Sequence, residues 1–512
     1  MILKHDFQKL ISMNRWVLLL LIPSVLIIEF TFIEQDNFWN NHYDPSYAYL
    51  MNGLNLAVNH GDIGHTDHPG TPVQMMVAVI ITTTYCFTHT GNSLTEDVLY
   101  YPEYYLRILA LVFTFVNIIL ILLLGFVALR CTGEIITSVM FQSATFIPIS
   151  HLIQHNFYDV KPEPVQFACT MILMMFFLVY STGMGLHQTC CLNKKLNLYV
   201  PAAPIVFGML TGVIIASKTI AFPLFIFPLF LIPGTRKKFL YAITVPASFL
   251  VVTIPIWSIY PKFIDRTLSF FVHSGKYGHG ASNVTDLQLL GRNCGHIAST
   301  APVFLIVLFV SIILVVTGFL RNNRDKRLNL LAALVIIQLI SIFLVCKEFA
   351  PRYMLPVLFT IVLNIYLIFL IFKIRPAVKN IVLLSFILAC LFLNFRIPFD
   401  PIDNNLPIKM EKGSQAIFCW DTPDPRAALY SGNSYSKKMR NALLAKNYTH
   451  FVFYDNWRDQ FTDWNHKLNF DSLNRTQTRI ILYGPEKSFQ KLCNRVQLIK
   501  LGRMKFLAVP LN

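Results

Sequence analysis

Two short acidic segments near the start of the chain carry residue types that acid–base chemistry needs. Asp44 precedes a proline, and Asp67-His68-Pro69 follows further along. A carboxylate can accept a proton from a hydroxyl nucleophile, and two carboxylates together can bind a divalent cation. Each also has a structural interpretation: Asp44 as a helix N-cap, and residues 66 to 72 as a turn with a second cap.

A third carboxylate, Glu163, lies between Pro162 and Pro164, which restrict the backbone on both of its sides. A local ion pair with Lys161 is the structural alternative. Several carboxylates on the polar connectors of one chain favour catalysis or metal binding. Spacing alone leaves both interpretations open.

Three cations complete the set of candidates. Lys218 interrupts two apolar stretches, where a charge is costly unless it finds an anion or reaches the surface. Arg352 follows another apolar run, and pairing with Glu348 is its structural alternative. Lys276 lies in the glycine-rich segment 273 to 280, which could cradle a phosphate but lacks P-loop spacing.

The elements that must position these residues are membrane helices. The chain has 512 residues, of which 54% are hydrophobic and 14% charged, which excludes a disordered chain, a collagen and a disulfide-stapled secreted module. Apolar runs of the roughly 20 residues needed to cross a bilayer recur between residues 16 and 395. The ten cysteines form no CxxC pair and no zinc spacing.

The net charge of +16 is interpreted as a topology signal and not as nucleic-acid binding, because no basic stripe with interleaved aromatic residues is present. Basic connectors are expected on the cytoplasmic side of a membrane. The connectors near residues 194, 236, 324 and 375 all lie on that side only if the apolar run 73 to 87 does not cross the membrane. The N-terminus is then cytoplasmic, and about eleven spans are predicted: residues 16–33, 106–129, 135–154, 164–183, 199–217, 218–232, 239–259, 301–320, 328–346, 353–372 and 380–395.

This map predicts a mainly α, polytopic membrane bundle over residues 1–395 with external juxtamembrane helices, and a soluble external domain over 396–512. The external loop 34–105 contains an amphipathic helix after Asp44 that is suited to the membrane interface. In the C-terminal domain, short apolar runs at 450–454 and 479–483 alternate with a polar, helical-looking stretch, which predicts a small α/β or α+β fold.

The order of these motifs resembles the C-type glycosyltransferase superfamily, which includes protein O-mannosyltransferases and the aminoarabinose transferases of lipid A. Asp44-Pro45-Ser46-Tyr47 and Asp67-His68-Pro69 are similar to its "Asp-Glu-x-x-Tyr … Asp-His-Pro-Pro" pattern, with Pro45 and Gly70 as departures. Four further matches are Lys161–Pro164 with "Pro-Asp-x-Pro-Leu", Gly212–Lys218 with "Gly-Leu … Ser-Lys", Arg107 near "Val-Arg-Leu", and Arg352–Pro356 with "Arg-Tyr-x-x-Pro".

The resemblance covers roughly residues 16 to 395 and implies an inverting hexosyl or pentosyl transferase that uses a polyprenyl-phosphate sugar. It implies Asp44 as the general base, with Glu163 orienting the acceptor or sharing a divalent ion with Asp44. The implied donor-phosphate ligands are Lys218, Arg352 and Lys276, and the implied supporting residues are Tyr47, Asp67, His68 and Arg107. The site is expected to face the periplasm from a bacterial inner membrane. The acceptor, whether lipid, glycan or protein, stays open.

Two other classes of protein remain as alternatives. A membrane transporter or lipid-linked-glycan flippase would carry ionisable groups at mid-span and paired, interrupted helices from internal repeats. A membrane scaffold would not need Asp44 or Glu163. The carboxylates gather at predicted external span ends and no internal repeat is evident, so the pattern favours an enzyme.

Overall fold

The structure is a computed structural model, and it divides into two compact units. The first contains Met1–Glu34, Thr66–Val73 and Ala110–Pro398, and the second contains Gln35–His65, Gln74–Leu109 and Phe399–Asn512. Within them the structure describes residues 15–33, 38, 46–58, 69–88, 91–146, 159–183, 202–273, 286–321, 325–347, 351–372, 374–395, 414–419, 452–455, 459–462, 467–468, 479–483, 486–501 and 505–510.

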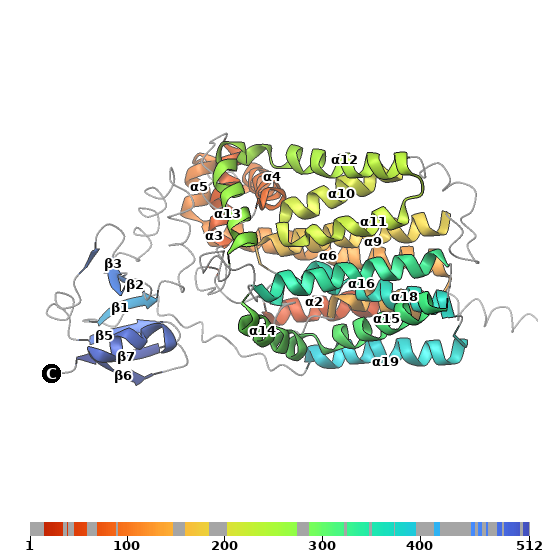
Figure 1. Cartoon of the computed structure of the whole chain (residues 1–512). Helices are drawn as coiled ribbons and strands as arrows, with labels where there is room; N and C mark the ends of the chain where they lie inside the picture. The colour runs from red at the N-terminus through yellow and green to blue at the C-terminus, as the bar shows by residue number, and fades with distance from the viewer. Residues whose placement is uncertain are drawn as a thin grey trace, which may run out of the picture. The chain divides into compact units, whose positions relative to one another are not determined.

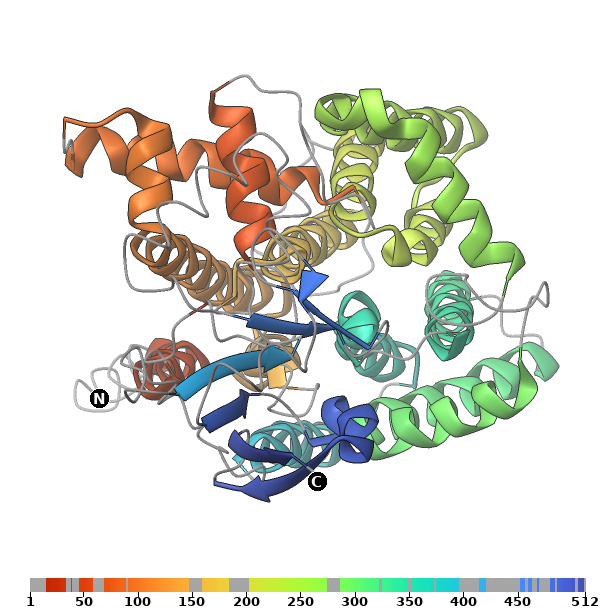
Figure 2. The ribbon, with the colours of Figure 1, turned by 90° about the vertical axis from the view of Figure 1, so that its left-hand side faces the viewer.

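The first unit is a bundle of helices that run alongside one another, seen from the side in Figure 1 and end-on in Figure 2. Its core is apolar, because nearly every position that faces a neighbouring helix is aliphatic or aromatic. Its longer helices are α2 (Leu21–Ile33), α9 (Pro162–Gly183), α10 (Ala203–Ser217), α12 (Thr235–Val252), α15 (Pro302–Leu320), α16 (Lys326–Lys347), α18 (Ile361–Phe372) and α19 (Pro376–Phe395), together with α6 (Pro102–Thr132) from Ala110 onward.

Shorter elements connect or extend these helices. They are η1 (Arg15–Leu20), α7 (Ile135–Ser143), η3 (Ala144–Phe146), η5 (Thr219–Phe225), α11 (Ile226–Leu231), η6 (Ile254–Ile259), α13 (Tyr260–Val272), α14 (Leu287–Thr300), η8 (Pro351–Met354) and α17 (Leu355–Leu358). Every apolar segment predicted to span is helical over most of its described residues.

Helix length divides the predicted spans into two groups. In the described part of the chain, six helices are long and apolar enough to cross a membrane, and a pair bent by 79° between Thr235–Val252 and Ile254–Phe270 makes a seventh. The predicted spans near 16, 135, 199, 218 and 380 are shorter apolar helices. A 15-residue helix is about 22 Å long, less than the roughly 30 Å of hydrocarbon. Among the described residues, length and composition therefore support six of the eleven predicted spans, with the bent pair counted as one, and the other five stay predictions.

The run 73–87 forms α4 (Thr71–Thr88), which is itself long and apolar enough to cross. The prediction that it does not cross rests on the distribution of basic connectors, and it stays a prediction. α3 (Ser46–Ala57) is helical as expected, and its place in the membrane interface stays a prediction. Ten of its twelve residues are buried, including Asn52 and Asn55. Gly53 permits this burial, since a Cβ there would lie 2.3 Å from Cγ1 of Val77 in α4.

Helix α16 begins at a capping carboxylate in the connector after α15. Oδ1 of Asp325 accepts hydrogen bonds from the backbone N and from Nε of Arg327, each at 2.9 Å. These bonds satisfy a donor in the first turn of the helix. The hydrogen bond from the Arg327 side chain holds the pKa of Asp325 below its usual value.

The C-terminal residues form a mixed seven-stranded sheet in the order β4-β3-β2-β1-β5-β7-β6. β1 (Ser414–Cys419) pairs in parallel with β2 (Val452–Asp455) and β5 (Arg479–Tyr483). The other strands pair antiparallel: β3 (Gln460–Thr462), β4 (Lys467–Leu468), β6 (Val496–Lys500) and β7 (Lys505–Pro510). The two predicted apolar runs are therefore strands on either side of β1. The expected helix at 434–446 lies outside the described residues.

Helices α10 and α12 approach closely because glycines face the contact. A Cβ on Gly208 would lie 2.6 Å from Cβ of Thr244, and one on Gly212 would lie 2.7 Å from both Cβ of Ser248 and the carbonyl oxygen of Val245. This small-residue spacing is typical of tightly packed membrane helices. It matters for the site described below, because α10 ends directly before Lys218.

Gly212→Val should force α10 away from α12 and lower the stability by about 1–3 kcal/mol, since a backbone oxygen cannot move aside as a side chain can. Thermal unfolding of the purified protein measures the loss. Ile205→Val, on an exposed position of the same helix, is the control and should stay within about 0.5 kcal/mol of wild type. Equal losses in the two variants would contradict the close packing.

Candidate functional site

Glu163 lies in the first turn of α9, where Pro162 begins the helix and the carboxylate faces the positive end of the helix dipole. Its side chain is completely buried. The predicted alternative, an ion pair with Lys161, is wrong. Nζ of Lys161 instead binds Oδ2 of Asp159 at 2.5 Å, and both of those residues are buried.

The partner of Glu163 is Lys218, whose ammonium group forms a buried hydrogen bond and ion pair with Oε1. Lys218 has an extended backbone between the end of α10 and the start of η5, as its place between two apolar stretches predicted. Its own carbonyl accepts a hydrogen bond from Nε2 of Gln166, one turn along α9, at 3.5 Å. Helix α9 therefore contacts both the side chain and the backbone of the residue at this break.

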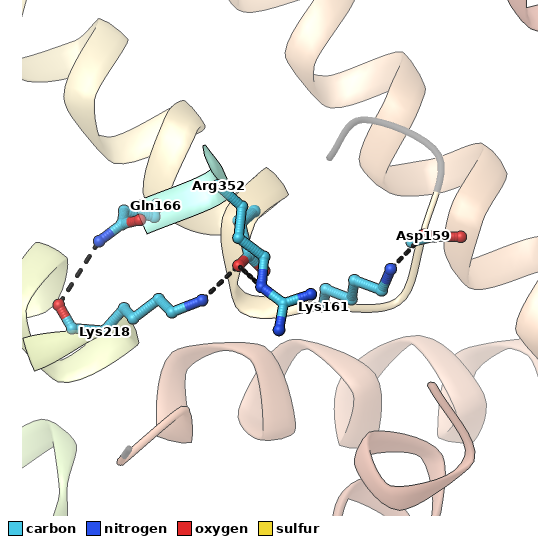
Figure 3. A network of polar contacts seen from close by, with 6 residues as sticks. Asp159, Lys161, Gln166, Lys218 and Arg352 are labelled. Atoms are coloured by element: carbon cyan, nitrogen blue, oxygen red, sulfur yellow. Dashed lines mark hydrogen bonds and ion pairs between the residues drawn. The ribbon is translucent and has the colours of Figure 1, made fainter. Parts of the chain in front are cut away.

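Arg352 reaches the same carboxylate oxygen from η8. Its Nε lies 3.8 Å from Oε1 of Glu163, and its side chain is 23% exposed, more than that of Lys218 at 7%. Figure 3 shows the two cations approaching from different elements. The ring of Tyr353 lies beside both, 4.5 Å from Nζ of Lys218 and 5.6 Å from Cζ of Arg352, within the range of cation–π attraction.

An aromatic pair holds α9 against the residue that directly follows α17. The ring centroids of Phe167 and Phe359 are 4.2 Å apart, and both side chains are buried. Aromatic pairs of this kind add about 0.5–1.5 kcal/mol to the burial of their area. Arg352 is thereby kept at the level of Glu163.

The charged residues of the cluster meet in two places. In the part of the chain that the structure describes, Lys161 pairs with Asp159, and Lys218 and Arg352 both lie beside Glu163. Among the described residues, Oε2 of Glu163 has no hydrogen-bond partner. A buried site of this composition is able to bind an anion at its more exposed end and to accept one further hydrogen bond.

Gly70, two residues after His68 in the sequence, contacts the end of α10. Gly70 donates its backbone N–H to the carbonyl of Ala216 at 3.0 Å, two residues before Lys218. Its φ is +59°, a conformation that glycine adopts readily and proline cannot. A proline could not take this backbone conformation, which explains why this chain has Gly70 where the pattern has its second proline. Asp67 and His68 themselves lie outside the described residues.

In the second unit, Glu103 holds residues on both sides of the segment that contains Asp44. Its Oε2 accepts from the backbone N of Phe38 at 2.8 Å, and its Oε1 accepts from the hydroxyl of Tyr47 at 2.5 Å. Tyr47, predicted as a supporting residue, is thus a buried donor to a carboxylate. Arg107, the other predicted supporting residue described here, is exposed on α6.

Asp44 and Lys276 lie outside the described residues. The expectation that Asp44 and Glu163 border one cavity stays a prediction. A divalent ion at Glu163 fits poorly, because Lys218 and Arg352 already neutralise this carboxylate and would repel a metal cation. The described residues contain no group of three or more metal-ligating side chains.

Sequence reasoning missed the contributions of Asp159, Gln166 and Glu103. Gln166 had a usable signal, because it lies three residues after Glu163 and such a residue shares its helix face. Asp159 lies two residues before Lys161, and this proximity could have suggested it as the partner of Lys161. Glu103 carried no signal, since its partners lie 65 and 56 residues away.

No family model and no curated protein matches the sequence. Two solved structures are similar in chain course. The crystal structure of an Archaeoglobus fulgidus oligosaccharyltransferase in the apo form matches at 11% identity with a TM-score of 0.44, over 81% of this chain and 64% of that chain. The crystal structure of ArnT from Cupriavidus metallidurans bound to undecaprenyl phosphate matches at 11% identity with a TM-score of 0.43, over 97% of this chain and 98% of that one.

The chain spans less than two thirds of the length of the archaeal enzyme. At these identities and TM-scores, the matches transfer no substrate and no mechanism to this chain.

Glu163→Gln should lower the stability by about 3–5 kcal/mol, because it leaves two cations without their shared buried anion. Thermal unfolding in detergent measures the effect. Adding Lys218→Met should recover part of the loss, since the second substitution removes the cation that was left unpaired.

Glu134→Gln is the matched control. It removes a carboxylate from an ion pair with Lys379 in which the side chain of Glu134 is 49% exposed, so its expected cost is at most about 1 kcal/mol. Similar losses for Glu163→Gln and Glu134→Gln would show that the buried ion pairs contribute no more than an exposed one.

Proposed function

We propose that this chain is an integral membrane glycosyltransferase that moves a sugar from a polyprenyl-phosphate donor to an acceptor on the non-cytoplasmic side of the membrane. The proposal rests on two kinds of observation. The first is the order of short motifs along residues 16 to 395. The second is the convergence of three of those motifs, around Glu163, Lys218 and Arg352, in one cluster.

The observation that carries the proposal is the convergence of two cations, from separate elements, on one buried carboxylate. Lysine and arginine side chains both donate hydrogen bonds, so a phosphate brought beside the two of them gains strong, charge-assisted hydrogen bonds. Arg352 is the more exposed of the two and is suited to make first contact with the phosphate. During transfer, the same cations would stabilise the charge that develops on the departing lipid phosphate.

The roles of the acidic residues differ in this proposal. Asp44 is the general base that accepts the proton of the acceptor hydroxyl, a contribution that is typically worth about 10²- to 10⁴-fold in rate. Glu163 is a positioning residue, because its Oε1 is engaged by Lys218 and Arg352. Its second oxygen, Oε2, is left to accept a hydrogen bond from the acceptor.

A transporter or flippase for lipid-linked glycans is the second candidate function. The break at Lys218 between α10 and η5 favours it, because discontinuous helices carry substrate sites in many transporters. Such a protein would need the same phosphate-binding cations. It would not need a general base at Asp44, and this difference separates the two functions.

The decisive experiment compares cells that lack this chain with cells that carry wild type, Asp44→Asn or Lys218→Ala, using mass spectrometry of polyprenyl-phosphate sugars. A transferase predicts that one such lipid accumulates without the chain and that wild type removes it. Asp44→Asn should leave at least about 100-fold less turnover, and Lys218→Ala should mainly raise the donor concentration needed for half-maximal rate.

A normal lipid profile in cells without the chain would exclude the transferase. Full activity of Asp44→Asn, with loss of function in Lys218→Ala, would instead favour the flippase. Glu134→Gln is the control for both variants, since this residue lies outside the cluster. It should behave as wild type.

A further inference from the structure

A pair of cysteines lies at the end of α16, in a part of the bundle that the proposed transfer does not use. Sγ of Cys294, in α14, lies 3.4 Å from Sγ of Cys346, in α16. A disulfide requires an S–S distance of about 2.05 Å. Side-chain rotation that closes the remaining gap would link the two helices covalently.

The surrounding contacts keep these two thiols opposed. Nδ2 of Asn293 donates to the carbonyl of Cys346 at 2.8 Å, so the residue before Cys294 is held directly on the partner cysteine. On the other side, Nζ of Lys347 donates to the carbonyl of Phe270 at 2.7 Å, which ties the end of α13 to the same turn. The two helices therefore have little freedom to separate the cysteines.

The two cysteines differ in access. Cys346 is buried, with 1% of its surface exposed, whereas Cys294 is half-buried. An external oxidant can therefore reach Cys294 first, and Cys346 lies in position to complete the reaction. The charge distribution predicts that residues 260–300 and the C-terminal end of α16 are on the non-cytoplasmic side, where disulfides persist.

We propose that Cys294 and Cys346 form a disulfide in the mature protein. The Cys294 thiolate attacks the disulfide of an oxidising thiol–disulfide exchange partner, which releases one thiol of that partner and leaves a mixed disulfide. The Cys346 thiolate then displaces the second thiol. Two protein thiols lose two electrons and two protons in total, and one partner disulfide becomes two thiols. The inference rests on the predicted orientation and not on the proposed transferase activity.

The bond would act on the connector that leads to the candidate site. It would fix α14 against α16 at the residue before Lys347, a short distance along the chain from Arg352. It would also close the chain between residues 294 and 346 into a loop, which restricts the unfolded ensemble. Reduction would release this restraint without altering any residue of the Glu163 cluster.

Counting thiols tests the proposal directly. Cells that produce the full-length chain are denatured in the presence of a maleimide carrying a polymer tag, and the number of tags is read from gel shifts. If the disulfide is present, Cys294→Ser frees Cys346 and adds one tag relative to wild type, and Cys346→Ser does the same. Denaturing conditions make the count independent of whether the variants fold.

The matched control is Cys390→Ser, which removes a free, buried thiol from α19 and should lower the count by one. The proposal also predicts that peptides containing residues 294 and 346 are found linked by mass spectrometry and separate on reduction. A loss of one tag in Cys294→Ser, equal to that in the control, would overturn it.

Discussion

The arrangement of the bundle around its candidate site depends on one interaction, the sharing of a single buried carboxylate by two cations. Removing a carboxylate from water costs several kcal/mol even after the protein relaxes, so Glu163 can be buried only where cations meet it. Those cations come from separate parts of the chain, Lys218 after α10 and Arg352 in η8. The start of α9, the end of α10 and the segment η8 must therefore lie close together in the bundle.

Several local features satisfy that requirement. Proline begins α9 directly before Glu163, and the extended backbone of Lys218 ends α10. Glycines let α10 pack closely against α12, which fixes the position of the end of α10 beside Lys218. The hydrogen bond from Gly70 to Ala216 brings the residue after the Asp-His-Pro motif beside the same helix end. The short helices α10 and η5 are explained by the same need, because an uninterrupted span would carry Lys218 into the hydrocarbon.

Hydropathy and charge were enough to predict most of the fold. Each apolar segment is mostly helical over its described residues, the break falls at Ser217 and Lys218 as expected, and two predicted strands flank β1. These features follow from local pattern, which a single sequence contains. Hydropathy does not show where a helix ends, so five of the predicted spans are shorter helices over their described residues. The amphipathic pattern of α3 likewise did not show that most of its residues are buried in the protein.

The partners within the site were less predictable. Lys161 pairs with Asp159 and not with Glu163 because of the course of the backbone at the start of α9. The hydrogen bond between Glu103 and Tyr47 joins residues 56 positions apart in the sequence. Such contacts are decided by tertiary packing, and the sequence pattern contains only the residue types. The residue types did identify Glu163, Lys218 and Arg352 as candidates, because charges beside apolar segments are costly and must find partners.

Binding of undecaprenyl phosphate to the purified full-length chain in lipid nanodiscs tests the central claim most directly. The comparison is between wild type and the double variant Glu163→Gln/Lys218→Met, which removes one charge of each sign and leaves no unpaired cation from that pair. The account predicts saturable binding by wild type that weakens roughly tenfold or more in the double variant, since a charge-assisted hydrogen bond is lost. Equal affinity of the two proteins, with both folded, would contradict it.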